Sequence, residues 1–71
     1  MDIELLESVI YGIYHMYDEG AELVDVYVDQ NTAEIVADHM KYDYAEDFVV
    51  CEIYLTHDGK FTIDVVYEAL R

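Results

Sequence analysis

Residues 22–41 constrain the fold of this chain most, because apolar and polar residues alternate along them with the period of a half-buried strand. In the middle of this segment, residues 30–33 (Gln-Asn-Thr-Ala) have turn chemistry, since Asn tolerates a left-handed backbone and Thr can hydrogen-bond nearby backbone groups. We therefore predict a β-hairpin with a four-residue loop that sets Asp29 opposite Glu34.

This register gives the predicted hairpin two unlike faces. One face is apolar, whereas the other carries opposed carboxylates, because Asp25 faces Asp38 when Asp29 faces Glu34. Like charges placed directly opposite destabilise a sheet by roughly 0.2–1 kcal/mol per pair. Two such pairs on one face indicate a surface kept for function.

A second hairpin is predicted around the Asp-Gly pair at residues 58–59, the strongest turn signal in the chain. A three-residue loop with a left-handed glycine sets Leu55 opposite Phe61. A two-residue loop would mix apolar and polar residues on each face, so the hydrophobic pattern selects the longer loop. In that register Glu52 faces Asp64, which makes a third carboxylate pair.

Residues 2–18 predict an amphipathic helix, because apolar residues recur at three- and four-residue steps from Ile3 to Tyr17. Asp2 suits its N-cap, and Gly20 suits the position just past its end. The simplest assembly is one α+β domain over residues 1–71, with an N-terminal helix packed on a four-stranded antiparallel meander sheet (α-β-β-β-β). The expected core consists of Ile3, Leu6, Ile10, Ile13, Val24, Val26, Val28, Ile35, Cys51, Ile53, Leu55, Phe61, Ile63 and Val65.

Residues 31–44 also fit a helix, which is an open alternative to the second strand of the first hairpin. Asn31 and Glu34 have the spacing of a capping box. The residues that would share one side of this helix are Ile35, Val36, His39 and Met40.

The charge balance is extreme, with 17 acidic residues against three basic ones and a net charge of −14. A hydrophobic content of 55% and eight tyrosines distinguish the chain from a disordered acidic tail, so we expect it to fold. Apolar runs are too short for a membrane span, and the N-terminus lacks the basic start of a secretion signal, so we expect a cytoplasmic protein. The lone Cys51 is expected to be a buried, inert thiol.

Enzyme chemistry finds little support in the sequence. There is no His-x-x-x-His, no cysteine pair and no Gly-rich phosphate loop, and the only serine, Ser8, has no evident base partner. The three histidines are scattered, which argues against zinc. A calcium site around Asp43, Glu46 and Asp47 would lack the alternating acids and central Gly of an EF-hand. We therefore expect no catalysis, no metal and no cofactor.

Charge density is the remaining signal. A compact chain of this length would be about 29 Å across, and duplex DNA carries on the order of 17 charges over that distance. The net charge of −14 is close to that number. Tyrosines among the acids offer flat apolar area that suits Arg and the stems of Lys. The predicted partner-binding residues are Asp25, Tyr27, Asp29, Glu34, Asp38, Asp43, Glu46, Asp47, Glu52, Tyr54 and Asp64.

In size, acidity and expected α+β make-up, the chain resembles the small acidic DNA-mimic proteins of bacteriophages, among them the Bacillus phage inhibitors of the histone-like nucleoid protein HU. The resemblance rests on no motif and assigns no residues. It implies a non-enzymatic inhibitor that occupies the nucleic-acid site of a basic host protein in the host cytoplasm or nucleoid, competes with DNA and does not itself bind nucleic acid.

Other interpretations stay open. An acidic face is also typical of a merely solvated surface or of a salt-adapted protein. The predicted outward positions of Val36, Val50 and Val66 would suit a homodimer interface instead. The main alternative function is an acidic regulatory or assembly module that binds a basic partner peptide or associates with itself.

Overall fold

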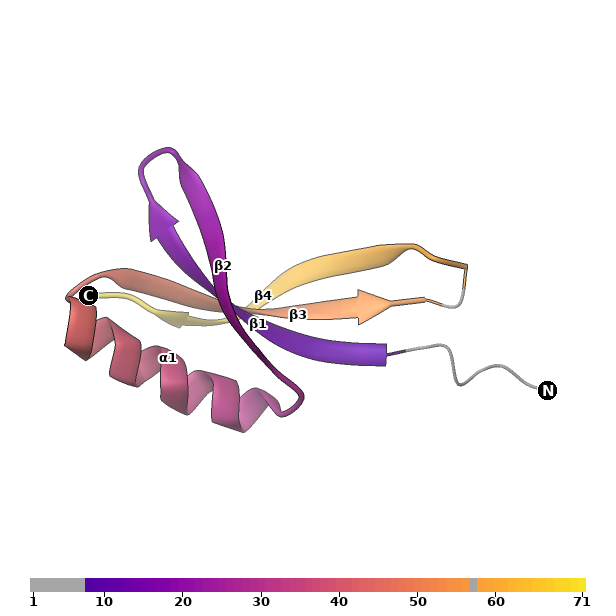
Figure 1. Cartoon of the computed structure of the whole chain (residues 1–71), viewed down its shortest axis with the longest axis horizontal. Helices are drawn as coiled ribbons and strands as arrows, with labels where there is room; N and C mark the ends of the chain where they lie inside the picture. Colours follow the sequence, from indigo (N-terminus) through magenta and orange to yellow (C-terminus); the bar gives the residue numbers. More distant parts are fainter. Residues whose placement is uncertain (1–7, 57) are drawn as a thin grey trace.

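The computed structural model describes residues 8–56 and 58–71. In chain order their elements are β1 (Ser8–Tyr17), β2 (Gly20–Tyr27), α1 (Gln30–Tyr44), β3 (Asp47–Leu55) and β4 (Phe61–Ala69). The strands form one antiparallel sheet in the order β2-β1-β3-β4. Helix α1 lies beside the half of the sheet that holds the start of β3, while the β3–β4 turn extends well beyond the helix (Figure 1).

The predicted N-terminal helix is wrong over residues 8–18, and the rest of it lies outside the described residues. Residues 8–17 form β1, which pairs with β2 on one side and β3 on the other. A central strand has apolar side chains on both faces, so its sequence does not alternate and can imitate a helix. Tyr, Ile and Val favour a strand here, and Gly12 disfavours a helix interior. The predicted helix end at Gly20 is instead a hairpin turn in which Tyr17 pairs with Gly20, whose φ is 151°.

The predicted hairpin over residues 22–41 is also wrong, and the alternative helix is confirmed, with a start one residue earlier than predicted. Asp29 is the N-cap of α1, because its Oδ2 accepts a hydrogen bond from the Thr32 backbone N–H at 2.8 Å. The helix ends at Ala45, which has a left-handed φ of 55° and donates its N–H to the Lys41 carbonyl at 2.9 Å. The cap is therefore an Asp29–Thr32 pair rather than the predicted capping box.

A helix between β2 and β3 follows from the sheet order. Both strands run antiparallel to β1, so they run parallel to each other with β1 between them. A tight turn cannot join parallel strands, and a crossover helix can. The opposed pairs Asp29–Glu34 and Asp25–Asp38 do not form across strands, because Glu34 and Asp38 lie on α1.

The second predicted hairpin is confirmed in its register. Leu55 pairs with Phe61, and Glu52 pairs with Asp64. A backbone hydrogen bond of 2.8 Å from Thr56 N–H to the Lys60 carbonyl closes the loop, and Gly59 has a φ of 87° as predicted.

The core lies between α1 and the sheet. Its buried members are Ile13, Ala33, Ala37, Phe48, Val50 and Ala69. The alanines face the sheet and have almost no side chain, so α1 can approach the strands closely. Among large side chains, only Ile13 and Val50 are fully buried within the described residues.

Most of the predicted core is wrong. Ile13 and Cys51 are buried as expected, and Ile10 and Ile53 are half-buried. Ile3 and Leu6 lie outside the described residues. The exposed members are Val24, Val26, Val28, Ile35, Leu55, Phe61, Ile63 and Val65. The main reason is that α1 covers the opposite face of the sheet from the one predicted. Accordingly Val50, expected outside, is fully buried, Val36 packs half-buried against the core, and Val66 is exposed as expected.

Candidate functional site

The most distinctive surface lies on the side of the sheet that carries α1. Four side chains stand in one row across the strands, since Tyr27 pairs with Tyr11, Tyr11 with Glu52 and Glu52 with Asp64. Tyr11 and Glu52 are each two residues from a buried core residue of the same strand, so this row shares the face of the core. The Glu52–Asp64 pair is the one predicted carboxylate pair that the strands form.

Tyrosine hydroxyls hold several of the carboxylates on this side. Tyr27 donates to Asp25 at 2.7 Å, and Tyr11 approaches Glu52 at 3.4 Å. Tyr67 of β4 donates to both carboxylate oxygens of a helix residue, Asp38. We call the whole set the acid–tyrosine surface, which consists of Tyr11, Asp25, Tyr27, Asp29, Glu34, Asp38, Glu52, Asp64 and Tyr67.

The carboxylates raise the pKa of these phenols. The hydrogen bond to Asp25 raises the pKa of Tyr27 above its ordinary value. The hydrogen bond to Asp38 does the same for the pKa of Tyr67, with a further contribution from the charge of Glu34. For Tyr11, desolvation is the main cause of the raised pKa, and Glu52 is the next. A phenol that stays protonated remains a hydrogen-bond donor. Tyrosine hydroxyls therefore donate to these carboxylates, as Lys or Arg side chains commonly do in other proteins.

Cations contribute little to this surface. Across residues 8–56 and 58–71, the one contact between a basic and an acidic side chain joins His15 Nε2 to Glu46 Oε1 at 3.5 Å, and it lies away from this surface. Lys41 instead lies over the ring of Tyr42, 5.1 Å from its centroid. The carboxylates of the acid–tyrosine surface are therefore available to an external cation.

The predicted partner-binding residues divide into two groups. Those brought to the helix-bearing side are Asp25, Tyr27, Asp29, Glu34, Asp38, Glu52, Tyr54 and Asp64, with Tyr54 two residues beyond Glu52 on β3. Asp43 lies at the end of α1, Glu46 in the connection that follows and Asp47 at the start of β3, so these three are separate from this surface. Tyr11 and Tyr67 belong to this surface but were not among the predicted residues. Their signal was the unusual number of tyrosines in so acidic a chain.

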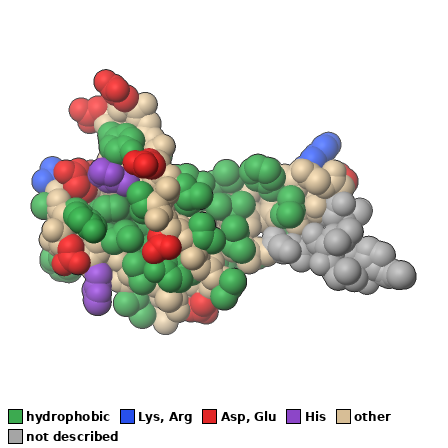
Figure 2. Space-filling view, in the orientation of Figure 1, with side chains coloured by type: hydrophobic (Ala, Val, Ile, Leu, Met, Phe, Trp, Pro, Cys, Tyr) green, Lys and Arg blue, Asp and Glu red, His purple; other side chains and the backbone are tan. Residues whose placement is uncertain are grey.

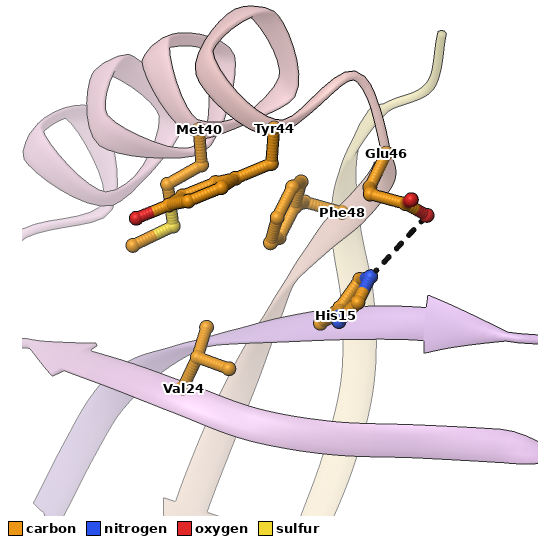
Figure 3. Close-up of a pocket in the computed structure, with 6 residues that line it drawn as sticks. All are labelled: His15, Val24, Met40, Tyr44, Glu46 and Phe48. Atoms are coloured by element: carbon orange, nitrogen blue, oxygen red, sulfur yellow. Dashed lines mark hydrogen bonds and ion pairs between the residues drawn. The ribbon is translucent and has the colours of Figure 1, made fainter.

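A hollow of about 460 Å³ lies between α1 and the first two strands. Its lining consists of His15, Val24, Met40, Tyr44, Glu46 and Phe48 (Figure 3). The His15 ring stacks on Phe48 with 5.1 Å between ring centroids, and its Nε2 points to Glu46. The lining combines apolar side chains with one imidazole and one carboxylate.

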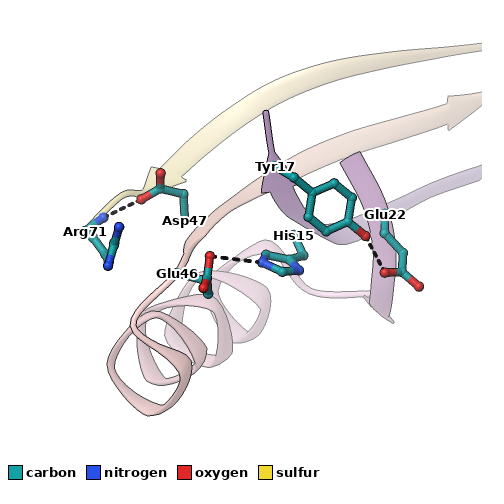
Figure 4. A network of polar contacts seen from close by, with 6 residues as sticks. All are labelled: His15, Tyr17, Glu22, Glu46, Asp47 and Arg71. Carbon is teal, nitrogen blue, oxygen red and sulfur yellow. Dashed lines mark hydrogen bonds and ion pairs between the residues drawn. The ribbon is translucent and has the colours of Figure 1, made fainter. Parts of the chain in front are cut away.

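Further polar contacts near this hollow lie within the β1–β2 hairpin and between the chain end and β3 (Figure 4). Tyr17 donates to Glu22 across the β1–β2 hairpin, and this hydrogen bond raises the pKa of Tyr17. Asp47 accepts a 2.8 Å hydrogen bond from the backbone N–H of Arg71. These contacts give Glu22 and Asp47 structural roles.

The described part of the chain shows neither a cluster of metal ligands nor a membrane-spanning helix. It contains no group of three His, Cys, Asp or Glu side chains arranged to hold a metal ion. Within the same residues, no helix is long and apolar enough to cross a membrane. Cys51 is buried as predicted, and this burial raises the pKa of its thiol.

Comparisons with known proteins add no relative. No protein-family model, no curated protein and no solved structure matches the chain.

Proposed function

We propose that this protein is a non-enzymatic DNA mimic that occupies the nucleic-acid site of a basic protein and competes with DNA. The observation that carries the proposal is the acid–tyrosine surface, whose six carboxylates have no Lys or Arg partner within the described residues. Because the resemblance noted above is to phage inhibitors of HU, a histone-like HU protein is the target that we propose first.

The mechanism is electrostatic competition. The target's Lys and Arg side chains normally contact phosphates and release the counterions condensed on DNA. A fixed array of carboxylates offers them the same contacts, and the long-range field accelerates the encounter. Hydrogen bonds such as Tyr67–Asp38 hold the carboxylates in place, so less side-chain freedom is lost on binding. The tyrosine rings offer additional cation–π contacts to Arg.

The shape of the molecule changes the comparison with DNA. The chain is not the compact body of about 29 Å that its length suggests, because its longest extent is 47 Å. Duplex DNA carries about 28 charges over that length. One copy, with −14, therefore has about half the linear charge density of the duplex.

A competition experiment tests the proposal. A fluorescent duplex is bound to a purified HU protein at moderate salt, and the acidic protein is titrated in while anisotropy reports released DNA. We expect release at near-stoichiometric amounts, with an affinity that falls steeply as salt rises. An unrelated basic DNA-binding protein serves as the specificity control, and its DNA should stay bound.

Matched charge variants locate the surface. The triple change Asp25→Asn, Glu52→Gln and Asp64→Asn keeps hydrogen-bond acceptors but removes three charges from the acid–tyrosine surface. The control, Asp18→Asn, Glu19→Gln and Asp43→Asn, removes three charges of the same residue types elsewhere. We expect only the first triple to abolish release. Equal loss from both triples would mean that general acidity suffices, and failure of the unchanged protein to release DNA from any basic protein tested would overturn the proposal.

The alternative function is a module that binds a basic peptide. The hollow beside Glu46 favours it, because an apolar lining next to a carboxylate suits a Lys or Arg side chain. The two functions differ in the same assay: a basic-peptide module would bind a peptide probe without releasing DNA, and Glu46→Gln would weaken that binding.

A further inference from the structure

The face of the sheet that points away from α1 is apolar, and no described element covers it; we call it the open face. Its most exposed members are Leu23, Val26, Leu55, Phe61, Ile63 and Val65, with exposed fractions between 39% and 60%. In Figure 2, hydrophobic side chains gather along the arm that β3 and β4 form beyond the helix. A small hollow of about 240 Å³ in this arm is lined by Ile10, Ile53, Leu55 and Phe61.

The side chains of the open face meet across the strands. A Cβ added at Gly12 would lie 2.8 Å from Cδ1 of Leu23 and 3.2 Å from Cδ1 of Ile53, so side chains from β2 and β3 converge above this glycine. Strand pairing brings Ile10, Ile53 and Ile63 into one row. The result is a continuous apolar surface over all four strands.

Among the described strand residues, charged side chains reach this face only at one end of the sheet. Asp47 pairs with Met16, and Glu68 pairs with Val49, so both acids lie at the end of the sheet near the start of β3. The acid–tyrosine surface lies on the other side. A basic partner is therefore attracted to the helix-bearing side of the sheet. The apolar part of the open face carries no charge that would complement such a partner.

The size of the open face matches what a dimer needs. Four strands at about 4.8 Å spacing and eight residues at about 3.3 Å each cover on the order of 500 Å². Two such faces bury about 1,000 Å², which is the lower bound for a specific interface. A single exposed patch of this size is at the upper end of what monomers carry.

The monomer is also poorly consolidated for its length. Its radius of gyration is 13.5 Å, compared with about 11 Å for a compact chain of this size. Only two large side chains are fully buried among the described residues. Chains this small commonly gain the missing stability by association.

We infer that the open face binds a second copy of this chain, giving a two-fold symmetric dimer in which the two sheets pack face to face. The face is self-complementary, as a two-fold interface requires. In the aligned class of sheet packing the strands stay within about 30° of each other, so the long axes of the two copies would lie nearly parallel. Both acid–tyrosine surfaces then face outward on opposite sides.

Dimerisation also bears on DNA mimicry, and this consequence of the dimer rests on the proposed function. Two copies carry twice −14, or −28, along a body whose longest extent is 47 Å in each copy. That is about one charge per 1.7 Å, the linear charge density of duplex DNA. The dimer therefore reaches the density that one copy lacks.

Sedimentation equilibrium and light scattering on the full chain test the inference. The monomer mass is 8.3 kDa; we expect a twofold larger mass. The dimer should tighten as salt rises, because salt screens the repulsion between two acidic copies, whereas binding to a basic partner should weaken. The mass is measured without any DNA-binding protein, so its outcome is independent of the competition experiment.

A pair of variants locates the interface. Ile63 on the open face and Ile35 on α1 are 49% and 50% exposed, so Ile63→Glu and Ile35→Glu make the same change at equal exposure. We expect Ile63→Glu to raise the dimer dissociation constant at least 100-fold and Ile35→Glu to leave it unchanged. If Ile63→Glu does not fold, Leu23→Glu tests the same face, and the melting temperature of the unchanged protein should rise with its concentration. A monomeric mass at all salts and concentrations, or equal effects of the two isoleucine variants, would overturn the inference.

Discussion

The hydroxyl of Tyr67 on β4 donates to both carboxylate oxygens of Asp38 on α1, at 2.9 and 2.8 Å. The two residues are 29 positions apart, and this contact connects the helix to the edge strand farthest from β2. It also holds a carboxylate of the acid–tyrosine surface in a fixed position. Structure and proposed function thus depend on the same hydrogen bond.

Removing this hydroxyl should loosen the helix on the sheet. We expect Tyr67→Phe to lower the urea midpoint of unfolding, because Asp38 loses its donor while the ring is kept. The matched control is Tyr42→Phe, since Tyr42 is 78% exposed and its hydroxyl has no hydrogen-bond partner among the described residues. An equal shift in both variants would contradict a role for the Tyr67–Asp38 bond.

Alkaline pH should weaken the fold through the tyrosines. Tyr17, Tyr27 and Tyr67 each have a folded-state pKa raised above 10.0, chiefly by a carboxylate hydrogen bond. A raised folded pKa means that the stabilisation is complete below the unfolded pKa of about 10 and is lost as pH rises through the higher folded value. In a pH titration, phenolate absorbance should therefore appear at higher pH in the native protein than in the protein unfolded in urea. Replacing these three tyrosines with phenylalanine should reduce the fraction of tyrosines that ionise only at the higher pH and leave Tyr11 in that fraction, whereas Tyr42→Phe should not reduce it.

Acid pH should act on the helix start. Hydrogen bonds from the backbone and side chain of Thr32 lower the pKa of Asp29, so this stabilisation is present above the unfolded pKa of about 3.9 and is lost as pH falls through the lower folded value. We expect Asp29→Ala to reduce helix content by circular dichroism at neutral pH, and Asp29→Ser to preserve it, since serine also caps helices. The difference between the unchanged protein and Asp29→Ala should shrink in acid. A constant difference would argue against the cap.

The small core makes one residue decisive. Ile13 is fully buried between α1 and the sheet, and we expect Ile13→Ala to lower the free energy of unfolding by about 2–5 kcal/mol. Ile35→Ala, at a half-exposed site on α1, should change it by less than about 0.5 kcal/mol. Urea unfolding at one protein concentration measures both. Similar costs at the two sites would mean that the core lies elsewhere.

Local chemistry was sufficient where the turn and the strands that it joins are adjacent in sequence. The β3–β4 hairpin follows from an Asp-Gly turn and an alternating pattern, and both are local, so its register was predictable down to the Glu52–Asp64 pair. The Asp29 cap is local too. It was not predicted because apolar and polar residues alternate along the preceding strand, which favoured a hairpin instead. The candidate site was predictable in its residue types, not in its geometry, because Tyr67 and Asp38 meet only when α1 packs on the sheet.

The sequence by itself determined the charge, the second hairpin and an abundance of acids and tyrosines. Only the tertiary structure decided that residues 8–17 are a strand, that residues 30–44 are a helix, and which face of the sheet this helix covers. The physical reason is burial. A strand apolar on both faces and a helix apolar on one can share a periodicity, and β1 became a strand because β2 and β3 both pair with it. With small alanines on its inner side, α1 packs over Ile13 and Val50 and leaves the other apolar face open.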